Sequence, residues 1–163
     1  MPERRRHMVL ACMLFWSVIS YECVSRFVCG TTQVVGRSMM PTLTDGERHL
    51  VDRLAYRFRL PHRGEIVAIR LPEDDFSSVK RIIALPGERI QIKDNAVYVQ
   101  GRRLDEPYLA AGVRTLAGCL SDGAYEVGPS CYFVLGDNRD VSADSRYFGA
   151  VRRDCIIGRL LVN

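Results

Sequence analysis

Short runs of hydrophobic residues, separated by polar turns, make up most of the chain after Gln33. The runs are rich in β-branched and aromatic residues, and Gly, Pro, Asp and Asn lie between them, which is typical of strands. The clearest runs cover residues 65–70, 89–93, 96–99 and 130–135. Ile90 and Ile92 alternate with polar neighbours, and Asp94 and Asn95 then indicate a tight hairpin turn. The pattern predicts a mostly β domain.

Two stretches depart from this strand pattern. Leu50–Leu60 suits either a helix or a strand, because Leu54 and Phe58 fit both periods. Residues 105–130 carry Gly, Pro and Asp and indicate a long connecting loop.

The N-terminal segment is different, because three arginines at residues 4–6 precede an uncharged stretch from Met8 to Tyr21. Three interpretations compete. A buried amphipathic helix would confine its apolar residues to one stripe, whereas here they occupy all faces of the helix. A cleaved signal peptide would end at a small-x-small site, which residues 20–23 do not offer.

The third interpretation is a retained transmembrane helix. A span needs about 20 residues, so this one would run past Glu22 and Arg26 toward Val28. The two charged residues could pair along the helix or extend to the interface. We favour this interpretation, and the arginines then place the N-terminal flank in the cytoplasm and the rest of the chain on the opposite side.

Composition and charge narrow the class of protein. A chain of 163 residues suits one compact domain with a short appendage. The net charge is only +4, and arginines are scattered among acidic residues, which argues against nucleic acid as a partner. The six cysteines form no CxxC pattern, so we expect no metal site. Cys119 and Cys131 could form a disulfide in an oxidising compartment, although free thiols are the default expectation.

Two residues are candidates for covalent chemistry. Ser38 lies between Gly36 and Pro41, and the missing donor of Pro41 forces the chain out of regular hydrogen bonding, which exposes the serine in a turn. A serine nucleophile needs a positioned base, and none of the three histidines lies in a recognisable triad motif. Lys80 is the better base, because burial in the apolar run 78–84 would lower its pKa. Taken alone, Lys80 would be interpreted as a surface lysine.

Three blocks of sequence together carry a resemblance to a known family. Residues 36–43 read Gly-Arg-Ser-Met-Met-Pro-Thr-Leu, residues 79–81 read Val-Lys-Arg, and residues 136–146 read Gly-Asp-Asn-Arg-Asp-Val-Ser-Ala-Asp-Ser-Arg. In this order they resemble the type I signal peptidases, which are membrane-anchored enzymes that remove targeting peptides from exported proteins.

The resemblance implies a role for each site residue. Ser38 would be the acylating nucleophile, Lys80 would be the general base, and Ser142 would hydrogen-bond and orient the lysine. The oxyanion would bind the backbone N–H of Ser38, because Gly36 replaces a serine whose hydroxyl some relatives use. Two buried ion pairs would support the site, formed by Asp144 with Arg146 and by Asp137 with Arg81.

The resemblance also implies the partners. Preprotein signal peptides would bind as an extended strand, with small residues at positions −1 and −3 in shallow apolar pockets. Val34, Met39 and Val79 flank the catalytic pair and could line these pockets, or they could be ordinary core residues. The other implied partner is a lipid membrane, and no cofactor, metal or nucleic acid is expected.

The implied architecture is a signal-peptidase-type β catalytic core of antiparallel sheets with one N-terminal transmembrane helix. Residues 1–30 would form the cytoplasmic basic flank and anchor, and residues 31–163 the extracytoplasmic Ser/Lys peptidase domain. Arg139 and Asp140 favour the bacterial plasma membrane, while the short chain also suits the mitochondrial inner membrane.

Two other classes of protein share some of these features. A self-cleaving Ser/Lys repressor has the same dyad but needs an N-terminal helix-turn-helix, and the first 30 residues here are a hydrophobic segment instead. An inactive paralogue that acts as a membrane scaffold would have no need of both Ser38 and Lys80. We therefore expect a membrane-bound serine endopeptidase.

Overall fold

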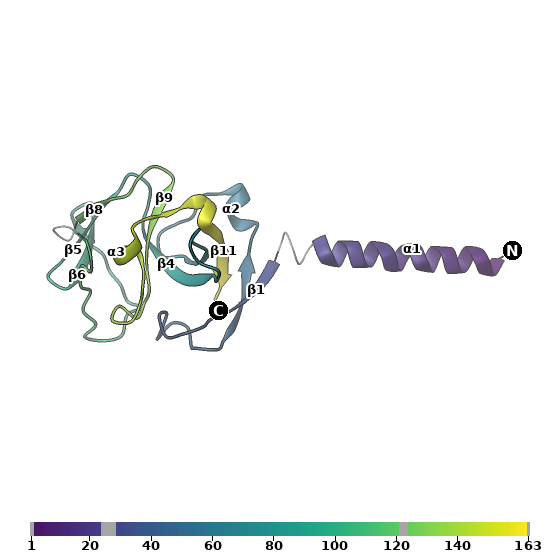
Figure 1. Cartoon of the computed structure of the whole chain (residues 1–163), viewed down its shortest axis with the longest axis horizontal. Helices are drawn as coiled ribbons and strands as arrows, with labels where there is room; N and C mark the ends of the chain where they lie inside the picture. Colours follow the sequence, from purple (N-terminus) through teal and green to yellow (C-terminus); the bar gives the residue numbers. More distant parts are fainter. Residues whose placement is uncertain (1, 24–28, 121–123, 163) are drawn as a thin grey trace.

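The computed structural model describes residues 2–23, 29–120 and 124–162. An N-terminal helix, α1 (Pro2–Cys23), stands apart from a β-rich domain that begins at β1 (Cys29–Gln33), as Figure 1 shows. The domain is built from two antiparallel sheets. The predicted mostly β architecture is confirmed.

Seven strands form the larger sheet, in the order β1-β2-β11-β3-β4-β9-β10. After β1, their bounds are β2 (Arg48–Asp52), β11 (Ile156–Leu161), β3 (Ile66–Ile69), β4 (Ser78–Ala84), β9 (Cys131–Leu135) and β10 (Val151–Arg152). β4 pairs with β3 on one side and β9 on the other. Its residues Ile82 and Ile83 have no solvent exposure, so β4 is an interior strand and a rigid support for side chains.

The smaller sheet has the order β7-β6-β5-β8, with bounds β7 (Arg102–Arg103), β6 (Ala96–Val99), β5 (Arg89–Lys93) and β8 (Ala124–Glu126). The predicted hairpin between β5 and β6 is confirmed, since Ile90 pairs with Val99 at the start of β5. Asp94 and Asn95 both have positive φ, of 51° and 59°, as a two-residue turn between twisted strands requires.

The helical segments of the domain are short. The ambiguous stretch Leu50–Leu60 forms the end of β2 and then α2 (Ala55–Phe58), while α3 (Ser145–Phe148) and a 3-10 turn (Arg153–Cys155) follow β9. The predicted connecting loop of residues 105–130 is largely irregular where it is described, but it also contributes β8, which lacks the length of a recognisable apolar run.

Three buried clusters form the core, and two of them position the functional side chains. In the first, Ile83 and Phe133 of the larger sheet pack with Ile90 of the smaller sheet and so join the two sheets. In the second, Met39 and Leu43, from the segment between β1 and β2, pack with β2, β3 and β4. Segments far apart in the sequence are therefore fixed against β4.

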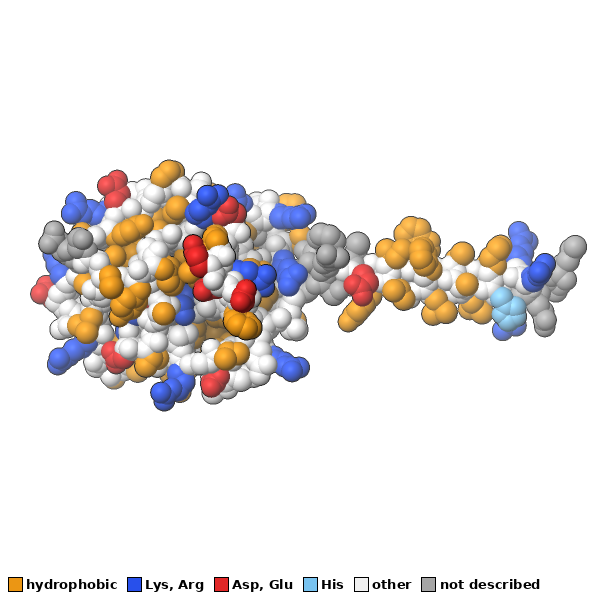
Figure 2. Space-filling view, viewed as in Figure 1, with side chains coloured by type: hydrophobic (Ala, Val, Ile, Leu, Met, Phe, Trp, Pro, Cys, Tyr) orange, Lys and Arg blue, Asp and Glu red, His pale blue; other side chains and the backbone are white. Residues whose placement is uncertain are grey.

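Helix α1 exposes its apolar side chains. Those of Leu14, Phe15 and Trp16 are each more than 60% exposed, and Figure 2 shows apolar groups along the helix with basic groups at its N-terminal end. Among the described residues, no helix combines the length and apolarity that a membrane crossing requires. The expected continuation of a span toward Val28 falls on residues 24–28, which lie outside the described residues.

Candidate active site

Ser38 lies in a turn between β1 and β2. The backbone N–H of Leu43 donates to the carbonyl of Met39 at 2.9 Å, and the Met40–Pro41 peptide bond is cis. Met39 and Leu43 are buried and attach the turn to the core, whereas Ser38 itself is half-buried. The turn thus holds the serine hydroxyl at the boundary between core and solvent.

Lys80 approaches this serine from β4. Its Nζ donates to Ser38 Oγ at 3.2 Å, although 42 residues separate the two in sequence. Lys80 is only 4% exposed, and this burial lowers its pKa; the charge of Asp144 opposes the shift and that of Arg146 adds to it. A lysine whose ammonium is destabilised in this way can take a proton from a neighbouring hydroxyl.

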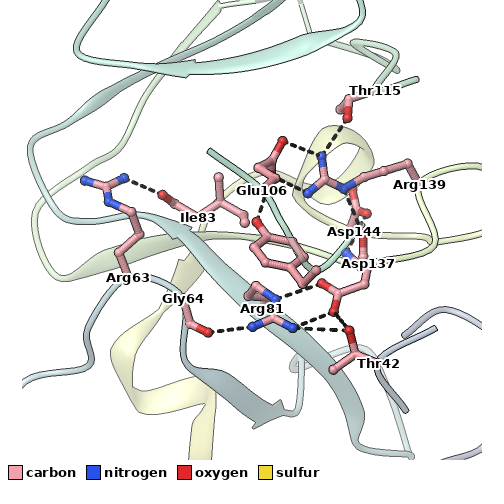
Figure 3. Close-up of polar contacts among 12 residues, drawn as sticks. Thr42, Arg63, Gly64, Arg81, Ile83, Glu106, Thr115, Asp137, Arg139 and Asp144 are labelled. Carbon is pink, nitrogen blue, oxygen red and sulfur yellow. Dashed lines mark hydrogen bonds and ion pairs between the residues drawn. The ribbon is translucent and has the colours of Figure 1, made fainter. Parts of the chain in front are cut away.

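Arg81, the next residue of β4, is held by Asp137 in a two-pronged ion pair. Its Nε donates to Asp137 Oδ1 at 2.9 Å and its Nη2 donates to Oδ2 at 2.6 Å, as Figure 3 shows. Thr42, from the Ser38 turn, donates its hydroxyl to the same carboxylate. Asp137 therefore joins the turn that carries the serine to the strand that carries the lysine.

A second buried ion pair lies on the other side of the site. Arg146 donates from Nε to Asp144 Oδ1 at 2.8 Å and from Nη2 to Oδ2 at 2.9 Å. Asp144 also accepts from the backbone N–H of Gly136 at 3.1 Å and caps the first turn of α3. The predicted pairing of Asp144 with Arg146 and of Asp137 with Arg81 is present in the structure.

Ser142 does not make the hydrogen bond to Lys80 that the resemblance implies. Its Oγ is buried and has no hydrogen-bond partner among the residues that the structure describes. Gly136 lies against it, and a Cβ at Gly136 would overlap Ser142 Oγ and the carbonyl oxygen of Ser38. The same loop donates the N–H of Asn138 to the Ser38 carbonyl at 3.0 Å, so glycine permits the close packing of loop and turn.

A further buried ion pair, between Arg139 and Glu106, holds the loop 136–146. Arg139 is buried and donates to Glu106 Oε1 from Nη2 and to Thr115 Oγ1 from Nη1 at 2.6 Å, as Figure 3 shows. Tyr108 donates its hydroxyl to Glu106 at 2.8 Å, and its ring lies 3.9 Å from the Arg81 guanidinium. This network links the irregular segment 104–115 to both halves of the site.

Sequence reasoning missed several members of this network, namely Thr42, Glu106, Tyr108, Thr115 and Arg139. Thr42 and Arg139 lie inside the blocks 36–43 and 136–146 that carry the family resemblance, so the motif itself was the available signal. Glu106 and Tyr108 lie in the predicted connecting loop of residues 105–130, and nothing local indicates that they reach the site. The contact of Glu106 with Arg139 joins residues that lie 33 positions apart in the chain.

The three candidate substrate-binding residues lie together. Val34, Met39 and Val79 are all buried in the cluster that packs the Ser38 turn onto the sheet. Val79 precedes Lys80 and Met39 follows Ser38, so both are next to the dyad in the chain. The structure thus groups the three residues beside the site, at positions that also belong to the core.

The described part of the chain offers no group of three or more His, Cys, Asp or Glu side chains that could hold a metal ion. Cys119 and Cys131 are free thiols. The groups that the structure brings together at this site are a serine hydroxyl, a buried amine and two ion pairs.

Comparisons with known proteins identify the family of the chain. The family model "Signal peptidase, peptidase S26" matches residues 5–162. A probable signal peptidase I-2 of Synechocystis is 36% identical over 99% of this chain and 74% of its own length. A signal peptidase IB of Staphylococcus aureus is 35% identical over 84% of this chain and 78% of its own length.

A solved structure extends the likeness to the fold. The crystal structure of a signal peptidase I from Enterococcus faecalis V583 matches 63% of this chain and 98% of that one, with 36% identity and a TM-score of 0.54. The family model, the sequence relatives and the solved structure therefore all give the same family. The chain belongs to the signal peptidase I family (peptidase S26), the serine peptidases that remove signal peptides.

Proposed function

We propose that Ser38 is the nucleophile and Lys80 the general base of this signal peptidase. The observation that carries the proposal is the 3.2 Å contact between Ser38 Oγ and the Nζ of a lysine that is only 4% exposed. A serine hydroxyl needs a base within hydrogen-bond reach, and burial is what makes a lysine basic near neutral pH.

The reaction proceeds in two halves. Neutral Lys80 takes the hydroxyl proton while Ser38 Oγ attacks the scissile carbonyl carbon, and the Lys80 ammonium then protonates the amine that leaves when the C–N bond breaks. Water, activated by the same amine, next attacks the acyl-serine ester and releases the carboxylate of the signal peptide. The backbone N–H of Ser38 is the proposed donor to the oxyanion in both halves.

The supporting residues hold Ser38 and Lys80 at the distance and orientation that proton transfer needs. Asp137 ties the Ser38 turn to Arg81 beside the lysine, and Asp144 with Arg146 packs the loop 136–146 against the turn. We assign Ser142 the role of orienting Lys80 when substrate fills the site, since its buried hydroxyl has no other partner among the described residues. All five are positioning residues.

The substrate is a preprotein signal peptide with small residues at positions −1 and −3. Val34, Met39 and Val79 are buried in one apolar cluster beside the dyad, and we assign them to shallow pockets that would admit side chains the size of Ala, Gly or Ser. An extended peptide would add along the exposed backbone near the Ser38 turn.

The proposed architecture is a membrane anchor in residues 1–30 and an extracytoplasmic catalytic domain in residues 31–163. Support comes from the exposed apolar side chains of α1 and from the basic residues 4–6 at its start. The relatives in Synechocystis and Staphylococcus aureus favour a bacterial plasma membrane over the mitochondrial inner membrane.

The test is cleavage of a preprotein with an Ala-x-Ala site by the full chain in detergent. Ser38→Ala and Lys80→Ala should each lower kcat by about 10³-fold or more, while folding is retained. Lys93→Ala is the matched control, because Lys80 and Lys93 are the chain's two lysines and Lys93 is exposed in β5. Full activity of either dyad variant would refute the assignment.

A further inference from the structure

A groove lined by arginines lies on the domain, apart from the catalytic dyad. It has a volume of about 760 Å³, and Arg53, Arg57, Arg152 and Arg153 line it together with a single carboxylate, that of Asp154. Asp154 forms an exposed ion pair with Arg152. Arginines therefore outnumber carboxylates among the residues that line the groove.

A hydrogen bond between two segments that line the groove fixes one of its arginines. Arg153 donates from Nη2 to the carbonyl of Tyr56 at 2.6 Å, which ties the 3-10 turn after β10 to α2. That contact engages a neutral carbonyl, so the positive charge of Arg153 is not cancelled. Two segments about 97 residues apart thus present their arginines to one surface.

The groove lies next to the point where the domain begins. A Cβ built on Gly30, the second residue of β1, would lie 2.9 Å from the guanidinium of Arg53. Cys23, the last residue of α1, is six residues before Cys29, which spans at most about 20 Å of extended chain. Arg53 therefore lies beside β1, the strand that follows α1 in the chain, and Figure 1 shows β1 and α2 at the same end of the domain.

An exposed aromatic side chain stands beside the arginines. In α2, Tyr56 is buried while the side chains of Arg57 and Phe58 are exposed, and Phe58 is 85% exposed. Leu60, two residues further on, is 59% exposed. Arginine next to exposed aromatic and aliphatic groups is the composition of surfaces that sit at the boundary between lipid headgroups and acyl chains.

We propose that this groove binds the phosphate groups of anionic phospholipids and docks the catalytic domain on the membrane surface. The inference rests on the proposed membrane anchor, because α1 brings this end of the domain to the headgroup region. Guanidinium groups bind phosphate with paired hydrogen bonds, and Phe58 would enter the interface beside them. A soluble phosphate has no apolar part that would contact the exposed Phe58, whereas a phospholipid has one.

The test measures partition of the full chain into vesicles of phosphatidylcholine alone and of phosphatidylcholine with roughly 30% phosphatidylglycerol. The unmodified chain should partition about tenfold more strongly into the anionic vesicles, and less so at high salt. Arg57→Gln combined with Arg152→Gln should remove most of this preference. Phe58→Ser should weaken binding to both kinds of vesicle.

The matched control combines Arg102→Gln with Arg103→Gln. These two arginines are exposed on β7 of the other sheet, so the control removes the same charge and should keep the preference. Both double variants retain the arginines at residues 4–6, whose own attraction to anionic lipid therefore cancels from the comparison. An unchanged preference in the groove variant, or an equal loss in the control, would overturn the proposal.

Two further measurements distinguish a failure of lipid docking at the groove from a failure of the proposed anchor or of the proposed dyad. Partition into neutral vesicles reports the apolar contacts of α1 and Phe58 and not the charge of the groove, and preprotein cleavage in detergent reports the dyad, so both should be retained in the variant that combines Arg57→Gln with Arg152→Gln. Glycerol phosphate at millimolar concentration should not compete with the vesicles. Effective competition would assign the groove to a soluble anion and contradict a membrane-docking role.

Discussion

The residue that dominates this protein's chemistry is Lys80, because its side chain combines burial with contact to a hydroxyl. Removal from water destabilises the ammonium form, and the nearby Asp144 carboxylate only partly offsets that effect. Below the lowered pKa the lysine is protonated and cannot accept the proton of Ser38. The pKa of this one amine therefore sets the acid limb of the enzyme's pH profile.

We predict that cleavage rises with pH and reaches half its maximum at the pKa of Lys80, below the ordinary lysine value of 10.5. With lysine labelled at Cε, NMR should show one signal that titrates below the usual range and disappears in Lys80→Met. A profile that stays flat through the titration of that signal would mean that Lys80 is not the base.

The same shift predicts the pH dependence of stability. Because the folded-state pKa is lowered, the unfolded chain binds more protons between that pKa and 10.5, so the free energy of unfolding should rise with pH across this window. Lys80→Met should remove this slope and be the more stable protein at pH 7. Urea unfolding of both proteins at several pH values measures the difference.

Residue Thr42 should matter although it carries no charge. Its hydroxyl donates to Asp137, the carboxylate that also holds Arg81. We predict that Thr42→Val, which keeps the shape, costs about 1–3 kcal/mol of unfolding free energy and lowers kcat with little change in KM. Thr44→Val on the exposed side of the same turn is the control. An unaltered kcat would show that Thr42 does not position the dyad.

At the scale of elements, the loop between β9 and α3 is organised by Asp144. This carboxylate receives the Arg146 side chain, the Gly136 N–H and the first turn of α3. We predict that Asp144→Asn, which leaves the Arg146 charge buried without a counter-charge, costs about 3–5 kcal/mol and lowers activity. Thermal and urea unfolding measure the loss.

The exposed pair of Arg152 and Asp154 supplies the comparison. Asp154→Asn also removes one carboxylate from an ion pair with arginine, but both partners are in water. Its urea midpoint should match that of the unmodified protein. Equal destabilisation by the two substitutions would mean that burial is not the reason for the importance of Asp144.

At the scale of the whole molecule, α1 is the part whose apolar surface finds no partner within the domain. Phe15 and Trp16 are more than 60% exposed near the middle of the helix. We predict that Phe15→Asp lowers partition of the full chain into neutral vesicles more than tenfold, since a charge at mid-membrane costs about 2.5–3.5 kcal/mol. Detergent cleavage should be unaffected.

Phe76 provides the control, because it is 84% exposed on the loop between β3 and β4. Phe76→Asp should leave partition into neutral vesicles as it is in the unmodified chain. Similar losses in both variants would show that exposed phenylalanines in general, and not α1 in particular, drive the association with lipid.

The sequence by itself determined the features that depend on neighbours close along the chain. The hairpin at Asp94 and Asn95 follows from alternation and turn chemistry, and α1 follows from a long apolar run behind three arginines. The family motif indicated the roles of Ser38 and Lys80, but it did not give the distance or the orientation between them. Strand β8 was missed because three residues are too few to show a period.

Only the tertiary structure decided which distant groups meet. It brought Lys80 to Ser38, left Ser142 without the expected bond, and assembled Glu106, Tyr108 and Arg139 into one network that contacts the site. It also brought arginines from α2 and the turn after β10 to one groove. Such contacts depend on how separate strands and loops pack, and the residues adjacent in the chain carry no record of that packing.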